Sequence, residues 1–195
     1  MKRRLIVGLT GNFGSGKSTV GRILKRLGAR KVIDCDRLAH EVFRPGHPLR
    51  EKVKSLFGPK TLFSRSAIAK EVFRDPRKRK QLERIIHPYV YQRTRSELKR
   101  FESGTMVLEV PLLFETGFDR LCNVTVAVLA GKSRLIKRLS RAGFSSEEVR
   151  ARLRAQLSER EKKRRADFWI QNSGSKSLLI RNTKLIWRKL NAGFK

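Results

Sequence analysis

Apolar residues along the chain alternate between unbroken runs and a helical spacing. Residues 5–9 (LIVGL) form a continuous apolar run, which is typical of a strand covered on both faces of a parallel sheet. Apolar residues between positions 20 and 27 then recur at helical spacing, and Gly28 follows where a helix commonly ends. Residues 31–34 have the composition of a second short strand. This part of the chain therefore predicts strand, loop, helix and strand in that order.

The pattern then becomes helical over residues 37–103, without a convincing strand. Asp75-Pro76 is typical of a helix start, with an N-cap followed by proline at the first helical position. Apolar residues from 82 to 90 line one face of the helix that follows. Pro88 lies inside this pattern, so we expect a kink or break near His87 rather than one straight helix.

Strand and helix patterns alternate again after residue 103. The predicted strands are 105–110, 123–129 and 168–170, and the predicted helices are 133–141, 146–165 and 178–190. Ser145 and Glu148 form a candidate capping box for the second of these helices. The alternation indicates an α/β fold, in which a parallel sheet of about five strands is flanked by helices and carries a helical insert.

Charge is the unusual feature of the composition. The 195 residues include 47 Lys and Arg against 17 Asp and Glu, a net charge of +30, which favours polyanionic partners such as nucleotides, nucleic acid or an anionic membrane surface. No run of about 18 apolar residues exists, so no membrane span is predicted. Cys35 and Cys122 are too few for a disulfide framework or a four-cysteine metal site, so we expect a reducing, cytoplasmic setting.

A glycine-rich loop carries the strongest chemical signal. Residues 11–18 (GNFGSGKS) fit G-x-x-x-x-G-K-[ST] and lie between the first strand and the first helix. Such a loop turns backbone N–H groups and the positive end of a helix toward phosphate oxygens. Lys17 would reach the β- and γ-phosphates of ATP, and the Ser18 hydroxyl would be a Mg²⁺ ligand. The predicted nucleotide-binding residues are Gly11, Gly14, Ser15, Gly16, Lys17, Ser18 and Thr19.

Two aspartates, Asp34 and Asp36, end the second predicted strand. Ligands of open α/β sheets bind beyond the carboxyl ends of the strands, so both carboxylates are expected to face the γ-phosphate. A carboxylate there can accept the proton of an attacking hydroxyl and help to hold hydrated magnesium. Both carboxylates are candidates for these roles, and Asp34 is also a candidate substrate-binding residue. A pair of solvated aspartates at a strand end is the alternative.

Further motifs follow in order along nearly the whole chain. They include DCD at 34–36, HP at 87–88, PLLFE at 111–115 and NSGS at 172–175. Together with the glycine-rich loop, this series resembles the dephospho-coenzyme A kinase family. The phosphate loop alone would be unspecific, and the ordered series makes the resemblance specific.

The resemblance implies transfer of the ATP γ-phosphate to the ribose 3′-hydroxyl of dephospho-coenzyme A, the last step of coenzyme A synthesis, with Mg²⁺. Asp36 matches the position of the family's presumed general base. The implied fold is a P-loop NTPase-type core of residues 1–36 and 104–195. It carries a helical substrate domain of residues 37–103 and a small lid of approximately residues 138–165.

Four more candidate site residues lie outside the loop. Arg138 and Arg141 match the family and share a helix face with Arg134, from which they could close over the phosphates as catalytic residues; a solvated basic face is the alternative. His87 could contact the substrate or be structural. Glu115 could face the acceptor site or be an N-terminal helix charge.

Two positions depart from the family pattern. His40, also taken as a substrate-binding candidate, stands where many members carry arginine. Gln171 stands where an aspartate is usual. Neither departure touches Lys17, Ser18 or Asp36.

Two other functions remain open. A nucleic-acid-binding protein with a regulatory phosphate loop would account for the charge, but aromatic residues make up only 8% of the chain and no Phe/Tyr-rich RNA platform is evident. Another small-molecule kinase of the same fold, acting on nucleosides or shikimate, would share the loop, but residues 87–88 and 111–115 argue against it. We expect a monomer that binds dephospho-coenzyme A and neither a membrane nor a specific nucleic acid, with non-specific polyanion adhesion as a by-product.

Overall fold

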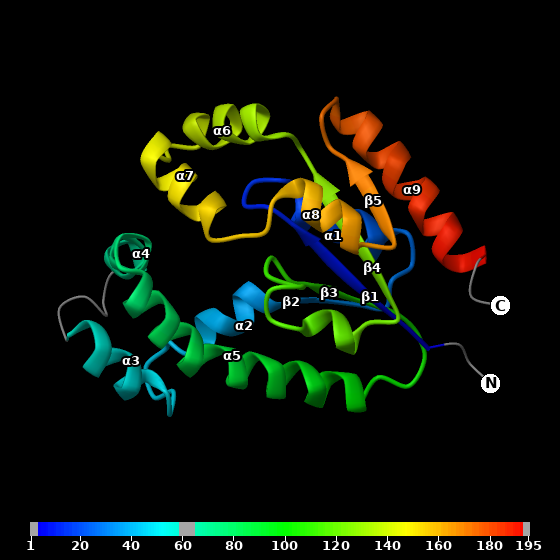
Figure 1. The fold of residues 1–195 in the computed structure, drawn as a ribbon. Coiled ribbons are helices and arrows are strands. Elements are labelled where there is room, and N and C mark those ends of the chain that lie inside the picture. The colour runs from blue at the N-terminus through cyan, green and yellow to red at the C-terminus, as the bar shows by residue number, and fades with distance from the viewer. Residues whose placement is uncertain (1–3, 59–64, 193–195) are drawn as a thin grey trace.

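A five-stranded sheet forms the centre of the computed structural model, which describes residues 4–58 and 65–192 (Figure 1). Every strand is paired in parallel with its neighbours, in the order β2-β3-β1-β4-β5. The strands are β1 (Arg4–Gly11), β2 (Lys31–Asp34), β3 (Gly104–Glu109), β4 (Val124–Leu129) and β5 (Phe168–Gln171). The predicted α/β fold with about five parallel strands is confirmed.

Helices connect the strands and supply the predicted insert. They are α1 (Lys17–Arg26), α2 (Cys35–Glu41), α3 (Arg50–Phe57), α4 (Arg65–Arg74), α5 (Pro76–Lys99), α6 (Lys132–Arg141), α7 (Ser146–Arg154), α8 (Glu159–Arg165) and α9 (Lys176–Ala192). A short 3₁₀ helix, Phe118–Leu121, lies between β3 and β4. In the described parts of the insert, between β2 and β3, every regular element is a helix. Within residues 4–58 and 65–192, no helix is both long enough and apolar enough to cross a membrane.

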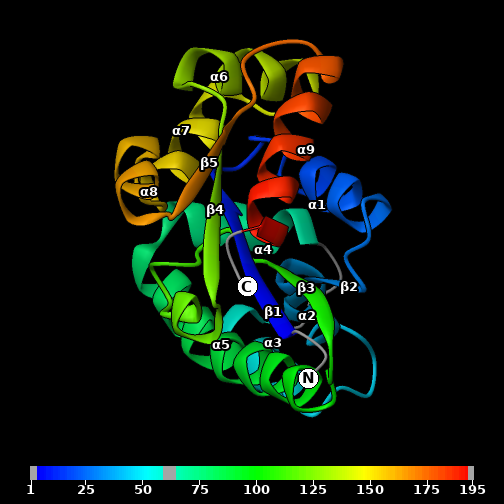
Figure 2. The same cartoon turned by 90° about the vertical axis from the view of Figure 1, so that its right-hand side faces the viewer.

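Alternate residues of β1 enter separate apolar clusters on the two faces of the sheet, as the two-residue repeat of a strand requires. Val7 and Leu9 belong to the cluster that packs against α1 and α9, which lie side by side (Figure 2). Ile6 points to the opposite face and joins the cluster that includes α5. Gly8 on that face has no room for a side chain, because a Cβ would lie 2.8 Å from Cys122 Sγ.

The insert and the helices after β4 meet beside the sheet. Figure 1 shows α6 and α7 on one side of the molecule and α3 and α5 on the other. Helix α4 packs against α7 and so joins the two groups. The phosphate loop, which follows β1, therefore lies between two helical groups that reach one another.

Two predicted helix starts are confirmed by their caps. Asp75 Oδ1 accepts the backbone N–H of Arg77 at 2.8 Å at the start of α5. Ser145 Oγ accepts the N–H of Glu148 at 3.1 Å at the start of α7. Both side chains satisfy N–H groups that a helix leaves without a partner in its first turn.

Two other expectations about helices are wrong. The predicted helix 146–165 is in fact two helices, α7 and α8, because Ser158 caps a new start by accepting the N–H of Glu161 at 3.1 Å. Of the kink or break expected near His87, the break is absent, since α5 continues through Pro88, and the kink stays a prediction. Proline costs that helix one backbone hydrogen bond. Buried apolar residues before and after Pro88 hold the helix against the core.

Candidate active site

Adjacent strands end side by side at the phosphate loop. β1 leads directly into residues 11–18, and its neighbour β3 ends at Glu109. The register of β2 on β3 places Asp34 opposite Glu109. Two carboxyl groups therefore stand at the carboxyl edge of the sheet, which is where ligands of open α/β sheets bind.

Glycines shape the phosphate loop at positions where a side chain would collide with neighbouring residues. Gly16 has a φ of 96°, and a Cβ there would lie 2.4 Å from Asn172 Nδ2. Gly14 has a φ of 77°, and a Cβ there would lie 2.9 Å from the Leu139 side chain. The Asn172 amide lies this close to Gly16 because it donates a hydrogen bond to the Ser15 carbonyl at 2.7 Å. The residue that follows β5 therefore supports the loop.

Two cations, Lys17 and Arg138, rest on carbonyl oxygens of this loop. Lys17 Nζ donates to the Gly11 oxygen at 2.9 Å, and Arg138 Nη1 donates to the Gly14 oxygen at 2.8 Å. Only 9% of Lys17 is exposed. This burial lowers the pKa of Lys17, and the carboxylate of Asp36 is the strongest opposing influence. The structure thus brings together the predicted loop lysine and one of the predicted arginines.

Glu109 is a site residue that the sequence analysis missed. Ser18 Oγ donates to Glu109 Oε1 at 2.6 Å. Glu109 is 6% exposed, and its burial raises the pKa of the carboxyl group, although the hydrogen bond from Ser18 opposes that rise. The available signal was an acidic residue at the end of an apolar strand, directly before the PLLFE motif.

Asp34 and Asp36 differ in their surroundings. Asp34 is the N-cap of α2, since its Oδ1 accepts the backbone N–H of Arg37 at 3.1 Å. Asp36 lies in the first turn of α2. Part of the Asp36 residue is exposed to solvent, but the surrounding protein desolvates the carboxyl group. This desolvation raises the pKa of Asp36, while the positive charge of Lys17 opposes the rise. Asp34 therefore has a structural task, and the charge of Asp36 interacts with that of the loop lysine.

A cavity of about 190 Å³ opens beside Asp36. Its walls come from α2, from α5 and from the turn after β3, and they are largely apolar. Its other ionisable wall residues include Glu83 and His87 of α5. Burial lowers the pKa of His87, with Glu83 opposing. Asp36 and His87 were predicted from separate motifs, and the fold places both on the wall of one cavity.

Helix α6 presents a basic face to an open hollow of about 590 Å³. The lining residues are Ser133, Arg134, Lys137, Arg138 and Arg141. The predicted shared face of the three arginines is therefore confirmed. Arg138 reaches the loop, whereas phosphate contact by the exposed Arg141 stays a prediction.

Glu115 and His40 do not line the cavity beside Asp36. Glu115 Oε1 accepts the N–H of Leu157 at 2.8 Å and lies 3.0 Å from Lys162 Nζ. It belongs to a turn after β3 and not to the start of an α-helix. His40 is exposed in the last turn of α2. Substrate contacts by both residues stay predictions.

The departure at Gln171 leaves the support of the loop intact. The Gln171 side chain is hydrogen-bonded to Ser173, and its backbone oxygen accepts from Asn182 Nδ2 at 3.3 Å. The neighbouring Asn172 still reaches the loop carbonyl of Ser15.

Comparison with known proteins adds a family match. The family model described as dephospho-CoA kinase matches residues 5–177. A dephospho-CoA kinase of Thermus thermophilus is 40% identical over 198 residues, which cover 100% of this chain and 96% of that protein. The match thus includes the loop, the insert and the helices after β4.

Solved structures agree with that match. A crystal structure of a Thermus thermophilus protein has 40% identity and a TM-score of 0.78, covering 97% of this chain and 99% of that one. A dephospho-CoA kinase from Campylobacter jejuni has 27% identity and a TM-score of 0.68, covering 98% of this chain and 100% of that one. A shikimate kinase from Bacteroides thetaiotaomicron, with 17% identity and a TM-score of 0.53 over 96% of this chain and 98% of that one, is alike in fold alone. The chain therefore belongs to the dephospho-CoA kinase family.

Proposed function

We propose that this chain transfers the γ-phosphate of ATP to the ribose 3′-hydroxyl of dephospho-CoA, giving CoA and ADP in the last step of CoA synthesis. The position of Asp36 is the observation that carries the proposal. Its charge acts on Lys17 in the phosphate loop, and it also lines the 190 Å³ cavity. One carboxylate therefore borders the two places that a nucleotide and an acceptor would occupy. The family match and the names of the relatives support dephospho-CoA as that acceptor.

On the ATP side, the loop residues Gly11 to Thr19 and the start of α1 face the phosphates. Lys17 and Arg138 now donate to loop carbonyls, and in the proposed complex they donate to phosphate oxygens instead. Arg141 adds charge from the same face of α6. Approximately residues 138–165 form the proposed lid over the nucleotide. These groups align and neutralise the transferring phosphoryl group, which is most of the catalysis that such a reaction needs.

Ser18 and Glu109 fit a magnesium ion in this scheme. The Ser18 hydroxyl is close enough to Glu109 to share a hydrogen bond at 2.6 Å, so an oxygen ligand and a buried negative charge lie together. Mg²⁺ commonly takes only one or two protein ligands and completes its shell with phosphates and water. The ion, when bound, adds positive charge at the β- and γ-phosphates.

On the acceptor side, the proposed base is Asp36. A bond forms between the 3′-oxygen and the γ-phosphorus, the bond from that phosphorus to the β–γ bridging oxygen breaks, and the hydroxyl proton passes to the Asp36 carboxylate. The raised pKa of Asp36 brings the base closer to neutral pH, where proton transfer is more effective. His87, Asp34, His40 and Glu115 are proposed to contact the substrate directly or to shape its site. Residues 37–103 form the proposed substrate domain.

The large positive charge is proposed to give only non-specific adhesion to nucleic acid. Contacts with a nucleic-acid backbone release counterions, so this binding should fall steeply with salt and be indifferent to sequence. We expect it to be lost by a few hundred millimolar salt, because a protein that makes about 6–10 phosphate contacts already loses about 10³- to 10⁵-fold in affinity between about 50 and 200 mM. Filter binding of unrelated RNA and DNA sequences across a salt series measures this. Salt-resistant, sequence-selective binding would favour a nucleic-acid function instead.

We also propose that the protein acts as a monomer in the cytoplasm. Cys35 and Cys122 are both free and largely covered, which suits a reducing compartment. Size-exclusion chromatography with light scattering measures the mass in solution. A stable dimer at micromolar concentration would contradict the monomer.

The central test is an ADP-release assay with rival acceptors. Dephospho-CoA, a set of nucleosides and shikimate are each supplied with ATP and Mg²⁺, and product formation is followed by mass spectrometry. We expect ADP release coupled to CoA formation with dephospho-CoA and only background release with the others. Equal or faster turnover of a nucleoside or of shikimate would refute the proposal.

A further inference from the structure

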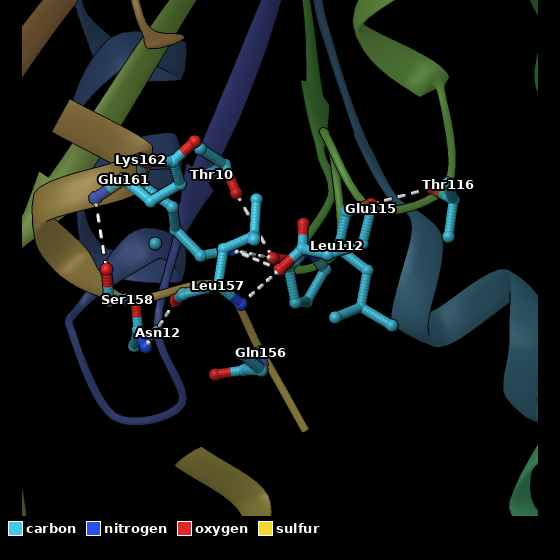
Figure 3. A network of polar contacts seen from close by, with 12 residues as sticks. Thr10, Asn12, Leu112, Glu115, Thr116, Gln156, Leu157, Ser158, Glu161 and Lys162 are labelled. Carbon is cyan, nitrogen blue, oxygen red and sulfur yellow. Dashed lines mark hydrogen bonds and ion pairs between the residues drawn. The ribbon is translucent and has the colours of Figure 1, made fainter. Parts of the chain in front are cut away.

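An ion pair between a buried lysine and a partly exposed glutamate joins two segments that the proposed reaction uses separately (Figure 3). Lys162 of α8 has no exposed surface, and its Nζ lies 3.0 Å from Glu115 Oε1. The same ammonium group donates to the Pro111 carbonyl at 2.7 Å. Pro111 and Glu115 belong to the turn after β3, and Pro111 lines the cavity beside Asp36. The wall of the acceptor cavity is therefore tied to α8.

The pair is also connected to the phosphate loop. Glu115 Oε1 accepts the backbone N–H of Leu157, and the Leu157 carbonyl accepts from Asn12 Nδ2 at 3.2 Å. The side chain of Gln156 accepts the N–H of Phe13 at 2.9 Å. Asn12 and Phe13 are loop residues, while Gln156 and Leu157 connect α7 to α8. The connection between these helices is thus bonded to the loop and to Glu115.

A second link runs from the cavity wall to the strand that precedes the loop. Thr10 Oγ1 donates to the same Pro111 carbonyl at 3.1 Å. The charge of Lys162 also acts on Lys17 and contributes to lowering its pKa. The turn after β3, the connection between α7 and α8, and the phosphate loop therefore share one polar network. Figure 3 shows Lys162, Leu157 and Glu115 at its centre.

The network resists partial opening. A buried charge that loses its partner is strongly unfavourable, so the segments that hold Lys162 cannot separate from it independently. Protein atoms cover Lys162 completely, so it cannot touch a substrate in this arrangement. Its contribution lies in fixing the cavity wall relative to the loop. An acceptor that contacts the cavity wall would therefore also move or stabilise the groups that bind ATP.

We propose that Glu115 and Lys162 are positioning residues that couple the acceptor site to the ATP site, so that each substrate binds more tightly in the presence of the other. The inference rests on the proposed function, because it takes dephospho-CoA as the acceptor. Coupling of this kind is reciprocal, so the factor for ATP must equal the factor for the acceptor.

Calorimetry on the full chain measures that factor. The Kd of a non-hydrolysable ATP analogue with Mg²⁺ is determined with and without dephospho-CoA, and the Kd of dephospho-CoA is determined with and without the analogue. For the wild type we expect each ligand to tighten the other by the same factor, of about 5-fold or more. In Glu115→Gln and in Lys162→Met we expect the factor to fall to about 1, where no coupling remains.

Folding is separated from coupling by a double variant. Glu115→Gln leaves the buried ammonium group of Lys162 without its negative partner, and Lys162→Met removes a donor to the Pro111 carbonyl, so each single variant should lower the melting temperature. Glu115→Gln combined with Lys162→Met removes both charges, so the melting temperature should recover in part. A merely structural pair would regain the coupling factor together with stability, whereas a coupling pair would not. Glu161→Gln is the matched control, since Glu161 is on the same helix and pairs with the exposed Arg164 and Arg165.

The outcomes are distinct. A wild-type factor of 1, or a double variant with the wild-type factor, overturns the inference while leaving the proposed function in place. Loss of the factor in Glu161→Gln as well would also overturn it, because the effect would not be specific to the pair of Glu115 and Lys162. Wild-type protein that neither binds dephospho-CoA nor releases ADP with it would refute the proposed function, and the inference with it.

Discussion

The proposed ATP side and the proposed acceptor side of this site are built in different ways. The ATP side is largely one continuous stretch, residues 11–19, which curls after β1 and ends on α1. The acceptor cavity instead takes its walls from α2, α5 and the turn after β3, which are far apart in the sequence. A contiguous site can be recognised from spacing alone. A composite site exists only once the sheet and the insert have brought its parts together.

The two sides also differ in charge. Lys17 and Arg138 bring cations to the carbonyl oxygens of the loop, whereas Asp36, Glu83 and His87 line the acceptor cavity. Asp36 stands at the border, because its charge acts on Lys17 while its side chain lines the cavity. Variants can therefore show whether each residue serves one substrate or both.

The largest effect is expected at the border, at Asp36. Asp36→Asn keeps the size of the side chain but removes the oxygen that takes the proton, so we expect kcat to fall about 10²- to 10⁴-fold. ATP should still bind, since the loop and Lys17 remain intact. The matched variant Asp34→Asn should do less, because asparagine is also a good N-cap and can still hold the start of α2. Turnover by ADP release and ATP affinity by calorimetry check both variants.

Two results would break this assignment. Greater damage from Asp34→Asn would mean that the base is the other aspartate. Loss of ATP binding in Asp36→Asn would mean that this carboxylate helps to bind the nucleotide or its metal. Asp36 would then belong to the ATP side alone, and the general-base role would be refuted.

The next largest effect is expected on the ATP side. Lys17→Ala removes a buried ammonium group that is positioned at the loop, and we expect kcat to fall about 10²- to 10³-fold, as when one preorganised donor to a developing charge is lost. ATP affinity should weaken too, while dephospho-CoA affinity should change little. Lys25→Ala is the control, because Lys25 is exposed on the same helix and its ammonium group donates to the Arg30 carbonyl. Near wild-type phosphoryl transfer by Lys17→Ala would refute the assignment of the phosphate loop.

A substitution of Glu109, the residue that the sequence analysis missed, tests its proposed role at the magnesium site. Glu109→Gln can still accept from Ser18 but carries no charge, so we expect the Mg²⁺ concentration for half-maximal activity to rise about 10- to 100-fold. A magnesium titration of ADP release measures this shift. Glu102→Gln is the control, since Glu102 is exposed just before the other end of β3. An unchanged titration, or full wild-type activity in excess EDTA, would contradict a magnesium role for Ser18 and Glu109.

The continuous features of the fold could be predicted from the sequence because neighbouring residues encode them. Apolar runs marked the strands, and single polar residues such as Asp75 and Ser145 marked helix starts through hydrogen bonds to nearby N–H groups. The phosphate loop was predictable for the same reason, since its shape depends on glycines a few residues apart.

Features that depend on how distant segments meet could not be predicted. Glu109 reaches Ser18 because β3 lies beside β1, and the sequence of neither segment indicates that the two strands are neighbours. Glu115 was weighed as a substrate contact or a helix charge, but docking of α8 gives it Lys162 as a partner. The start of α8 is a different case, because Ser158 and Glu161 repeat the S-x-x-E spacing of Ser145 and Glu148, and this local signal was overlooked.

The smallest effect is expected at His87, on the acceptor side alone. Burial lowers the pKa of His87, so the imidazole is neutral at pH 7 and gains its charge only as the pH falls through a value below its ordinary 6.5. A neutral hydrogen bond contributes about 0.5–1.5 kcal/mol, so His87→Phe, which removes both ring nitrogens, should raise the KM for dephospho-CoA about 2- to 13-fold with little change in kcat or in the KM for ATP. The wild-type KM for the acceptor should be flat from about pH 7 to 8 and change only at lower pH, and this change should be absent in the variant. His47→Asn is the control, because His47 lies outside the cavity and its ring nitrogen accepts the Leu49 N–H, which an asparagine oxygen can also do. Steady-state kinetics at several pH values decide the matter: a shift in the KM for ATP, or an equal effect of His47→Asn, would remove His87 from the acceptor site and leave Asp36 as the link between the two sides.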